Sequence, residues 1–93
     1  MYTASDILKE AIELKARKEA DYQGSKFTVD DYFPFDDLSY IHMLWIKMLR
    51  IRNVVESGGE VNFESAEDSL IDLINYSAMY AAHIKNRKRS SDV

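Results

Sequence analysis

The sequence predicts an all-α protein, a three-helix protomer that completes a helical bundle as a dimer. Apolar residues recur at intervals of three and four over three stretches of the chain, which is the period of a helix with one buried face. The single proline and the glycines fall between these stretches, where breaks between helices are expected. No pair of alternating apolar and polar segments indicates strands. The 93 residues fit a single domain, residues 1–93.

The first helix is expected over about residues 5–22. Thr3 or Ser5 can cap its start, and Asp6 follows Thr3 at the spacing of a capping box. Gly24 ends the helix, and Pro34 keeps residues 23–35 from continuing it, so this segment is predicted to be a packed connector. The apolar stripe consists of Ile7, Leu8, Ala11, Ile12, Leu14 and Ala20.

The second helix is expected over about residues 36–56, with Asp36 and Asp37 at the positive end of its dipole and glycines after its end. His42 lies beside the apolar face and is predicted to be a hydrogen-bonded residue of the core. The main stripe is Ile41, Leu44, Met48, Ile51 and Val55. Additional apolar residues widen it, namely Leu38, Met43, Trp45, Ile46 and Leu49. Because one neighbour cannot cover so wide a surface, we expect a homodimer or higher oligomer with this helix at the interface.

The third helix is expected over about residues 63–85, capped by Asn62 or Ser65. Tyr76 and Tyr80 flank its stripe and are predicted to pack with their hydroxyls at solvent. The basic residues that follow are expected to form a frayed, solvated tail, residues 86–93. The predicted core stripe is Leu70, Leu73, Ile74, Ser77, Ala81 and Ile84.

Composition and charge exclude several classes of function. The chain has no cysteine and two histidines, so any metal must be held by oxygen atoms. The net charge of −4 argues against general nucleic-acid binding. No apolar run has the length of a membrane span, and the start lacks the basic and apolar regions of a signal peptide. The cytoplasm is therefore the expected location.

One polar stripe is predicted on the third helix. Asp68, Asp72 and Asn75 fall on one side of the helical wheel, opposite the core stripe. Carboxylates four residues apart repel each other unless a cation lies between them. Lys47 and Arg50 on the second helix are the natural partners. They can form salt bridges with the aspartates, or they can hold phosphate oxygens beside a metal that the aspartates bind; the spacing leaves both open.

Three motifs occur in a characteristic order. They read K-x-x-D-Y-x-G from Lys18, K-x-x-R-I from Lys47, and D-S-x-x-D-x-x-x-Y-x-A from Asp68. In this order the chain resembles a small phage-type family of all-helical proteins grouped with the nucleotide-modification-associated domains. More distantly, it resembles the MazG-type all-α nucleoside triphosphate pyrophosphatases. The resemblance covers most of residues 5–84.

The resemblance implies a nucleotide substrate and Mg²⁺-dependent hydrolysis of the bond between its α- and β-phosphates. It implies that Asp68 and Asp72 are metal ligands and that Lys47 and Arg50 bind phosphate. Asp21 is then a further ligand or a group that orients the attacking water. Oxygen ligands suit magnesium, which keeps several waters and bridges phosphate oxygens.

The alternative is a non-catalytic helical interaction protein, such as a phage-encoded inhibitor or regulator of a host protein in the host cytoplasm. Residues 27–37, FTVDDYFPFDD, combine aromatic and acidic side chains and can serve as an interface for that partner. The charged set is then an internal network that fixes helix register. A catalytic set should line an open cleft, whereas a structural network should be closed and satisfied internally.

Overall fold

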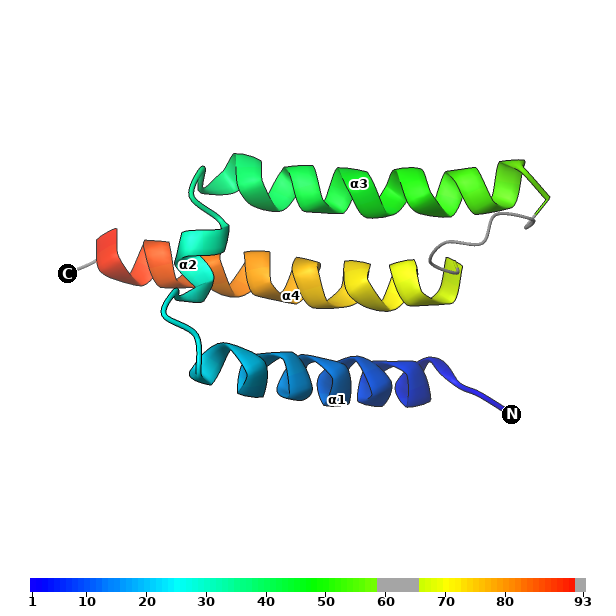
Figure 1. Ribbon diagram of the computed structural model, residues 1–93, viewed down its shortest axis with the longest axis horizontal. Coiled ribbons are helices and arrows are strands. Elements are labelled where there is room, and N and C mark those ends of the chain that lie inside the picture. The colour runs from blue at the N-terminus through cyan, green and yellow to red at the C-terminus, as the bar shows by residue number, and fades with distance from the viewer. Residues whose placement is uncertain (59–65, 92–93) are drawn as a thin grey trace.

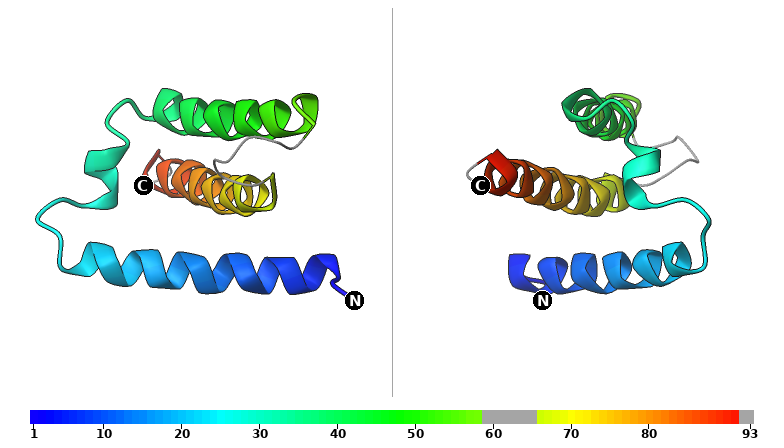
Figure 2. Two further views of the ribbon diagram at one scale, coloured as in Figure 1. Left: turned by 45° about the vertical axis from the view of Figure 1, so that its right-hand side comes forward. Right: turned by 90° about the vertical axis from the view of Figure 1, so that its left-hand side faces the viewer.

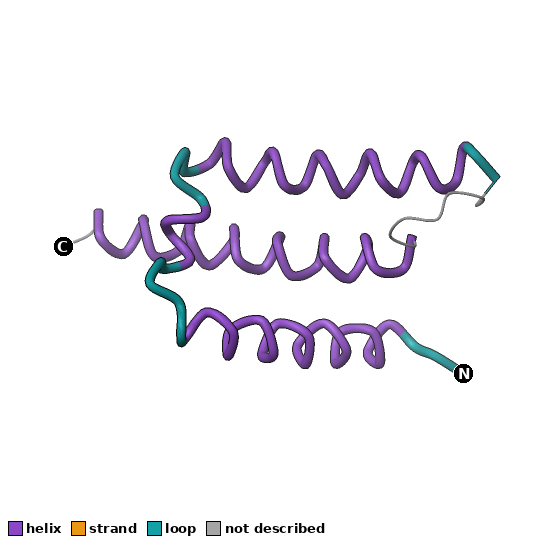
Figure 3. Tube along the Cα trace, viewed as in Figure 1, coloured by secondary structure: helices purple, strands orange, loops and turns teal. Residues whose placement is uncertain are grey.

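The computed structural model describes residues 1–58 and 66–91, and these parts of the chain are helices joined by loops, without strands (Figure 3). The helices in chain order are α1 (Ala4–Gln23), α2 (Val29–Tyr32), α3 (Asp37–Glu56) and α4 (Ala66–Ser91). The prediction of an all-α fold is confirmed. None of the described helices is long and apolar enough to cross a membrane.

Helix α4 is the central element of a three-helix layer. Figure 1 shows it between α3 and α1, and it packs on both, more extensively on α3. The chain direction in Figure 1 makes α1 and α4 parallel to each other and α3 antiparallel to both. The views in Figure 2 keep α4 between the other two long helices. Side chains on the inward faces of three helices therefore meet on α4.

Local sequence signals fix the start of α1 and its connection to α3. The Thr3 hydroxyl accepts a hydrogen bond from the Asp6 N–H, and the Asp6 carboxylate accepts one from the Thr3 N–H. This reciprocal pair confirms the predicted capping box. Gly24 caps the other end of α1, as expected. The predicted connector contains a single helical turn, α2, whose preceding Thr28 donates its N–H to Asp31 at 2.8 Å.

An aromatic cluster joins the connector to α3 and α4. The Tyr40 ring is buried and stacks on Phe33, with centroids 4.5 Å apart, and on Tyr80, with centroids 5.1 Å apart. Phe33 also meets the edge of Tyr76. Stacked aromatic rings contribute about 0.5–1.5 kcal/mol each beyond the area that they bury. The cluster holds the connector against α4.

Helices α3 and α4 turn different faces inward from those predicted, whereas α1 buries Ala11 of its predicted stripe. On α4 the polar residues Ser69 and Asp72 are buried, whereas Leu70, at 49% exposure, faces solvent. On α3 the buried residues are Tyr40 and Lys47, and most of the predicted core stripe is at least 47% exposed. A helical wheel gives the angles between side chains but not the direction that points to a neighbour. Here aromatic stacking and an ion pair decide that direction.

Three smaller predictions are corrected. His42 is exposed rather than part of the core. The Tyr80 hydroxyl donates a hydrogen bond to Asp37 instead of pointing to solvent. Helix α4 continues to Ser91, so residues 86–91 of the predicted tail are helical. Helix α3 begins at Asp37, close to the predicted start, and the predicted caps Asn62 and Ser65 lie outside the described residues.

Candidate functional site

A buried ion pair lies where the three long helices meet. Lys47 Nζ on α3 is 2.8 Å from Asp72 Oδ2 on α4, and the two side chains are 9% and 11% exposed. Lys18 Nζ on α1 is 3.6 Å from Asp72 Oδ1, with its side chain half exposed. Asp72 therefore interacts with a cation from each neighbouring helix. We call Lys18, Lys47 and Asp72 the charged triad.

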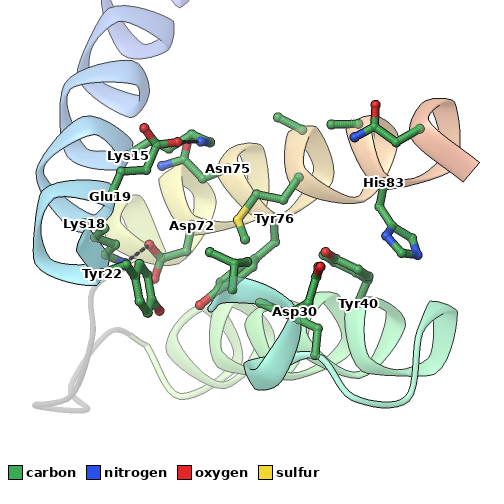
Figure 4. A pocket seen from close by; sticks show the side chains of 16 residues that line it. Lys15, Lys18, Glu19, Tyr22, Asp30, Tyr40, Asp72, Asn75, Tyr76 and His83 are labelled. Atoms are coloured by element: carbon green, nitrogen blue, oxygen red, sulfur yellow. Dashed lines mark hydrogen bonds and ion pairs between the residues drawn. The ribbon is translucent and has the colours of Figure 1, made fainter. Parts of the chain in front are cut away.

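A cavity of about 290 Å³ opens beside this triad. Figure 4 shows its lining side chains, with Asp72 and Lys18 joined at one end and His83 at the other. Aromatic rings from the connector and all three long helices form much of its wall: Tyr22, Phe33, Tyr40 and Tyr76. The volume is near the lower end of the roughly 300–1,000 Å³ of small-molecule sites, which are typically apolar with a few polar groups.

Two polar features of the cavity come from α1 and α4. Lys15 and Glu19 form an ion pair one helical turn apart, so their charges offset each other. Asn75 lies one turn after Asp72 and points toward the cavity near this pair (Figure 4). Its Nδ2 is buried and makes no hydrogen bond within the described part of the chain. A buried donor without an acceptor is costly, and such groups are few in folded proteins.

The structure brings together some of the predicted site residues. Lys47 and Asp72 are in direct contact, as the predicted charged cluster requires. Asp21 lines a shallower hollow that shares Lys18, Tyr22 and Tyr76 with the main cavity. Arg50 is exposed on α3 close to one turn after Lys47, and Asp68 is exposed on α4 one turn before Asp72. The catalytic and metal-binding roles of these residues remain predictions.

The metal site was predicted from the two aspartates of α4. Within residues 1–58 and 66–91, no three histidine or acidic side chains gather closely enough to hold a metal by themselves. A cation at Asp68 and Asp72 therefore needs ligands from outside this set, which the oxygen atoms of a phosphate can supply.

Sequence reasoning missed several lining residues. In the sequence Lys18 is only the first residue of a motif and has no predicted partner, although it pairs with Asp72 on α4. The aromatic wall was also missed, because its four rings come from four separate segments. One signal was available: Tyr76 follows Asp72 by four residues, so both lie on one side of α4.

A second polar cluster connects the start of α3 to the last third of α4. The Tyr80 hydroxyl donates to Asp37 Oδ1 at 2.9 Å, and Arg87 Nη1 donates to both oxygens of Asp37 at 3.0 and 3.1 Å. Asp36 pairs with His83 and, at 3.5 Å, with Arg87. These contacts explain why α4 stays helical beyond the predicted end.

Hydrogen bonds within this cluster shift the pKa values of its members. The Tyr80 hydroxyl, assisted by Arg87, lowers the pKa of Asp37 below its ordinary value. The same bond to a carboxylate raises the pKa of Tyr80, and the Asp37 charge raises that of Arg87. Burial, with the nearby charge of Asp30, raises the pKa of Tyr40. The cluster is therefore most stable with Asp37 ionised and Tyr80 neutral.

Comparison with known proteins gives one match. The sequence profile described as "Nucleotide modification associated domain 1" matches residues 18–84. The matched range runs from Lys18 to Ile84 and so includes the charged triad, the connector and most of the cavity wall. No curated protein and no solved structure matches the chain significantly.

Proposed function

We propose, because the chain belongs to the nucleotide modification associated domain 1 family, that the cavity and the charged triad bind a nucleotide. The more specific proposal is a Mg²⁺-dependent pyrophosphohydrolase of the MazG-like, phage type that acts on a nucleoside triphosphate. Such a substrate is consistent with activity in the cytoplasm, which is the host's for a phage-encoded chain. The observation that carries the proposal is Asp72, a largely buried carboxylate that lines the cavity and is held by two lysines.

The position of Asp72 supports a binding site more than a closed structural network. A network that only fixes helix register is expected to be shut off from solvent, but Asp72 and Lys18 lie on the wall of a cavity. The Lys18 side chain is half exposed, so its ammonium group is able to leave Asp72 for a phosphate oxygen. Lys47 and Arg50 are the other proposed phosphate-binding groups.

The donor chemistry of α4 fits magnesium. Asp68 and Asp72 supply two carboxylates from one helix, and Mg²⁺ is commonly held by one or two carboxylates together with substrate phosphates and waters. When bound, Mg²⁺ neutralises phosphate charge and polarises the phosphoryl oxygens. The two carboxylates would hold the ion, and the lysines would neutralise the remaining charge of the phosphates.

The proposed reaction adds one water molecule across the bond between the α- and β-phosphates. The water oxygen bonds to the α-phosphorus, the bond from that phosphorus to the bridging oxygen breaks, and the products are a nucleoside monophosphate and pyrophosphate. A carboxylate must take the proton of the attacking water, and Asp21 is the proposed group because it lies in the hollow next to the cavity.

We also propose that the chain forms a homodimer through the outer face of α3. The outer face of α3 exposes Leu38, Trp45 and Val55 to 70%, 62% and 68%. Together with the exposed residues Ile41, Met48 and Leu49, they form a continuous apolar surface along one side of α3, and large exposed patches of this kind mark interaction sites. A second copy, which carries the same surface, is a natural occupant because two-fold interfaces are self-complementary.

A second candidate function is a non-catalytic interaction protein, such as a phage-encoded regulator of a host protein. The connector favours it, because Phe27, Tyr32 and Phe35 are 54%, 52% and 74% exposed and lie among acidic residues. Exposed aromatic anchors of this kind are typical of binding surfaces. Under this alternative, Phe35→Asp abolishes binding to the host protein, and nucleotides have no effect on the chain.

The test of the hydrolase proposal is pyrophosphate release from a panel of nucleoside triphosphates, with Mg²⁺ and with EDTA. The proposal expects Mg²⁺-dependent release by the wild type and its loss in Asp72→Asn. Glu67→Gln is the matched control, because it removes an exposed carboxylate from the same helix. No release by the wild type, or equal release by Asp72→Asn, contradicts the proposal.

A further inference from the structure

We infer that the cavity between α1, α2 and α4 is a nucleobase subsite and that Asn75 recognises the base. The inference deepens the proposed function and rests on it, since it assigns one part of the nucleotide to one part of the site. The occupant is a planar, uncharged ring with a hydrogen-bond acceptor on its edge. Its phosphates would extend toward the charged triad.

The Nδ2 atom of Asn75 is a hydrogen-bond donor without a partner in the described part of the chain. This atom is buried and belongs to a residue of the cavity wall. Leaving such a donor unsatisfied costs free energy that a ligand acceptor recovers on binding. A carboxamide presents a donor beside an acceptor, and the edges of nucleobases carry the same pair of groups.

The aromatic wall of the cavity suits a planar ring. Tyr22 and Tyr76 line it from α1 and α4, with Phe33 and Met79 also in the lining. Every nucleobase has a π-face, and stacking on aromatic side chains contributes to binding whatever the base. A cavity of about 290 Å³ has room for a nucleobase with its sugar but not for a whole triphosphate.

The distribution of charge distinguishes the proposed base end of the site from its phosphate end. Lys15, which lies near Asn75 in Figure 4, is paired with Glu19, so this part of the cavity suits an uncharged group. The excess of cations is at Asp72, which interacts with both Lys18 and Lys47. Asn75 follows Asp72 by three residues, a rise of about 4.5 Å along the helix. One side of α4 therefore carries both ends of the site in the order that a nucleotide requires.

The test is calorimetric titration of the full chain with unphosphorylated nucleosides, without metal. The probes are adenosine, guanosine, cytidine, uridine and thymidine. We expect at least one to bind the wild type saturably and Asn75→Leu to weaken that binding by about tenfold or more, because a hydrogen bond in a desolvated site is lost. Asn53→Leu, the matched change at an exposed asparagine of α3, should bind as the wild type does.

Two further measurements make the result decisive. Asn75→Leu removes an unsatisfied buried donor, so its melting temperature without ligand should equal or exceed that of the wild type. Asn75→Asp keeps the shape but replaces the donor by an acceptor, and it should also lose nucleoside binding. The inference is overturned if no nucleoside binds the wild type, or if either Asn75 variant binds nucleosides as the wild type does.

The outcome is separable from that of the proposed hydrolase. If the wild type releases pyrophosphate and Asn75→Leu has the same KM as the wild type, the hydrolase proposal stands and the base subsite is ruled out. If the wild type binds a nucleoside through Asn75 but releases no pyrophosphate, the base subsite stands and the hydrolase proposal is ruled out.

Discussion

Asp72 is buried with an ammonium group on each carboxylate oxygen, one from Lys47 and one from Lys18. A buried carboxylate without a partner is strongly unfavourable, and here the pairing with Lys47 compensates that cost. Removing one member of this ion pair is therefore expected to destabilise the fold more than replacing both members by apolar residues. The same residue is the proposed metal ligand, so the stability of the fold and the proposed activity would depend on one side chain.

We predict that Asp72→Asn lowers the free energy of unfolding by about 3–5 kcal/mol in metal-free buffer, because it removes the negative charge that lies 2.8 Å from the buried Lys47 ammonium group. Denaturant unfolding measures this loss. The double variant Lys47→Met/Asp72→Leu should recover most of it, since apolar residues of similar size can replace a buried ion pair. An Asp72→Asn variant as stable as the wild type would mean that the pair contributes nothing.

The pH dependence of stability should report on Asp37. Because its pKa is lowered by Tyr80 and Arg87, it contributes stability above its unfolded pKa and loses it as pH falls through the folded value. The melting temperature of the wild type should exceed that of Asp37→Asn at pH 7, and the difference should shrink below about pH 4. Thermal melts between pH 7 and pH 2.5 check this; a constant difference would be the contrary result.

Part of this residue-level arrangement could be predicted from the sequence. The contact between Lys47 and Asp72 followed from opposite charges at matching positions on two helices. The role of Lys18 could not be inferred, because it depends on α1 lying beside α4 rather than elsewhere in the molecule. Asn75 was placed on the polar side of its helix, but whether its amide finds a partner is decided only by tertiary packing.

At the scale of the elements, the start of α3 and the last turns of α4 stabilise each other. Asp36, the residue before α3, has a φ of 57° and directs its carboxylate to His83 and Arg87. The sequence signal for the end of α4 was the loss of apolar periodicity after Ile84. That signal failed because polar side chains, rather than apolar ones, hold this part of the helix. The presence of each long helix was predictable from apolar periodicity, whereas the end of α4 depends on ion pairs between residues far apart in the sequence.

Backbone strain at Asp36 gives a test of this junction. Residues other than glycine tolerate a positive φ poorly, so Asp36→Gly should be more stable than Asp36→Ala by about 1 kcal/mol. Both variants lose the same carboxylate, and the difference therefore isolates the backbone. Chemical denaturation of the pair measures it. Equal stabilities would show that the residue relaxes to an ordinary conformation.

At the scale of the whole molecule, the three long helices form a layer with a polar centre and a partly apolar exterior. This distribution explains why the predicted core stripes are exposed: the apolar surface of α3 exceeds what α4 can cover. The fold class was predictable from helical periodicity and turn residues. Which side of each helix faces inward was not, because a helix that is apolar on more than one side does not show from its sequence which side packs within the protomer.

We predict that the chain sediments as a dimer or higher oligomer at micromolar concentration and that Trp45→Lys converts it to a monomer. The substitution places a charge in the centre of the exposed apolar face of α3. Asn53→Lys adds the same charge at an exposed polar position of that helix and should leave the assembly intact. A monomeric wild type would contradict the proposed homodimer.

Isothermal titration of the wild type with nucleoside triphosphates tests whether the centre of this layer binds a nucleotide. We expect saturable binding at one site per chain, stronger with Mg²⁺ than with EDTA, and weakened by Lys18→Met, which removes a cation from the cavity wall. Absence of binding for every triphosphate in the presence of Mg²⁺ would contradict nucleotide binding at this site.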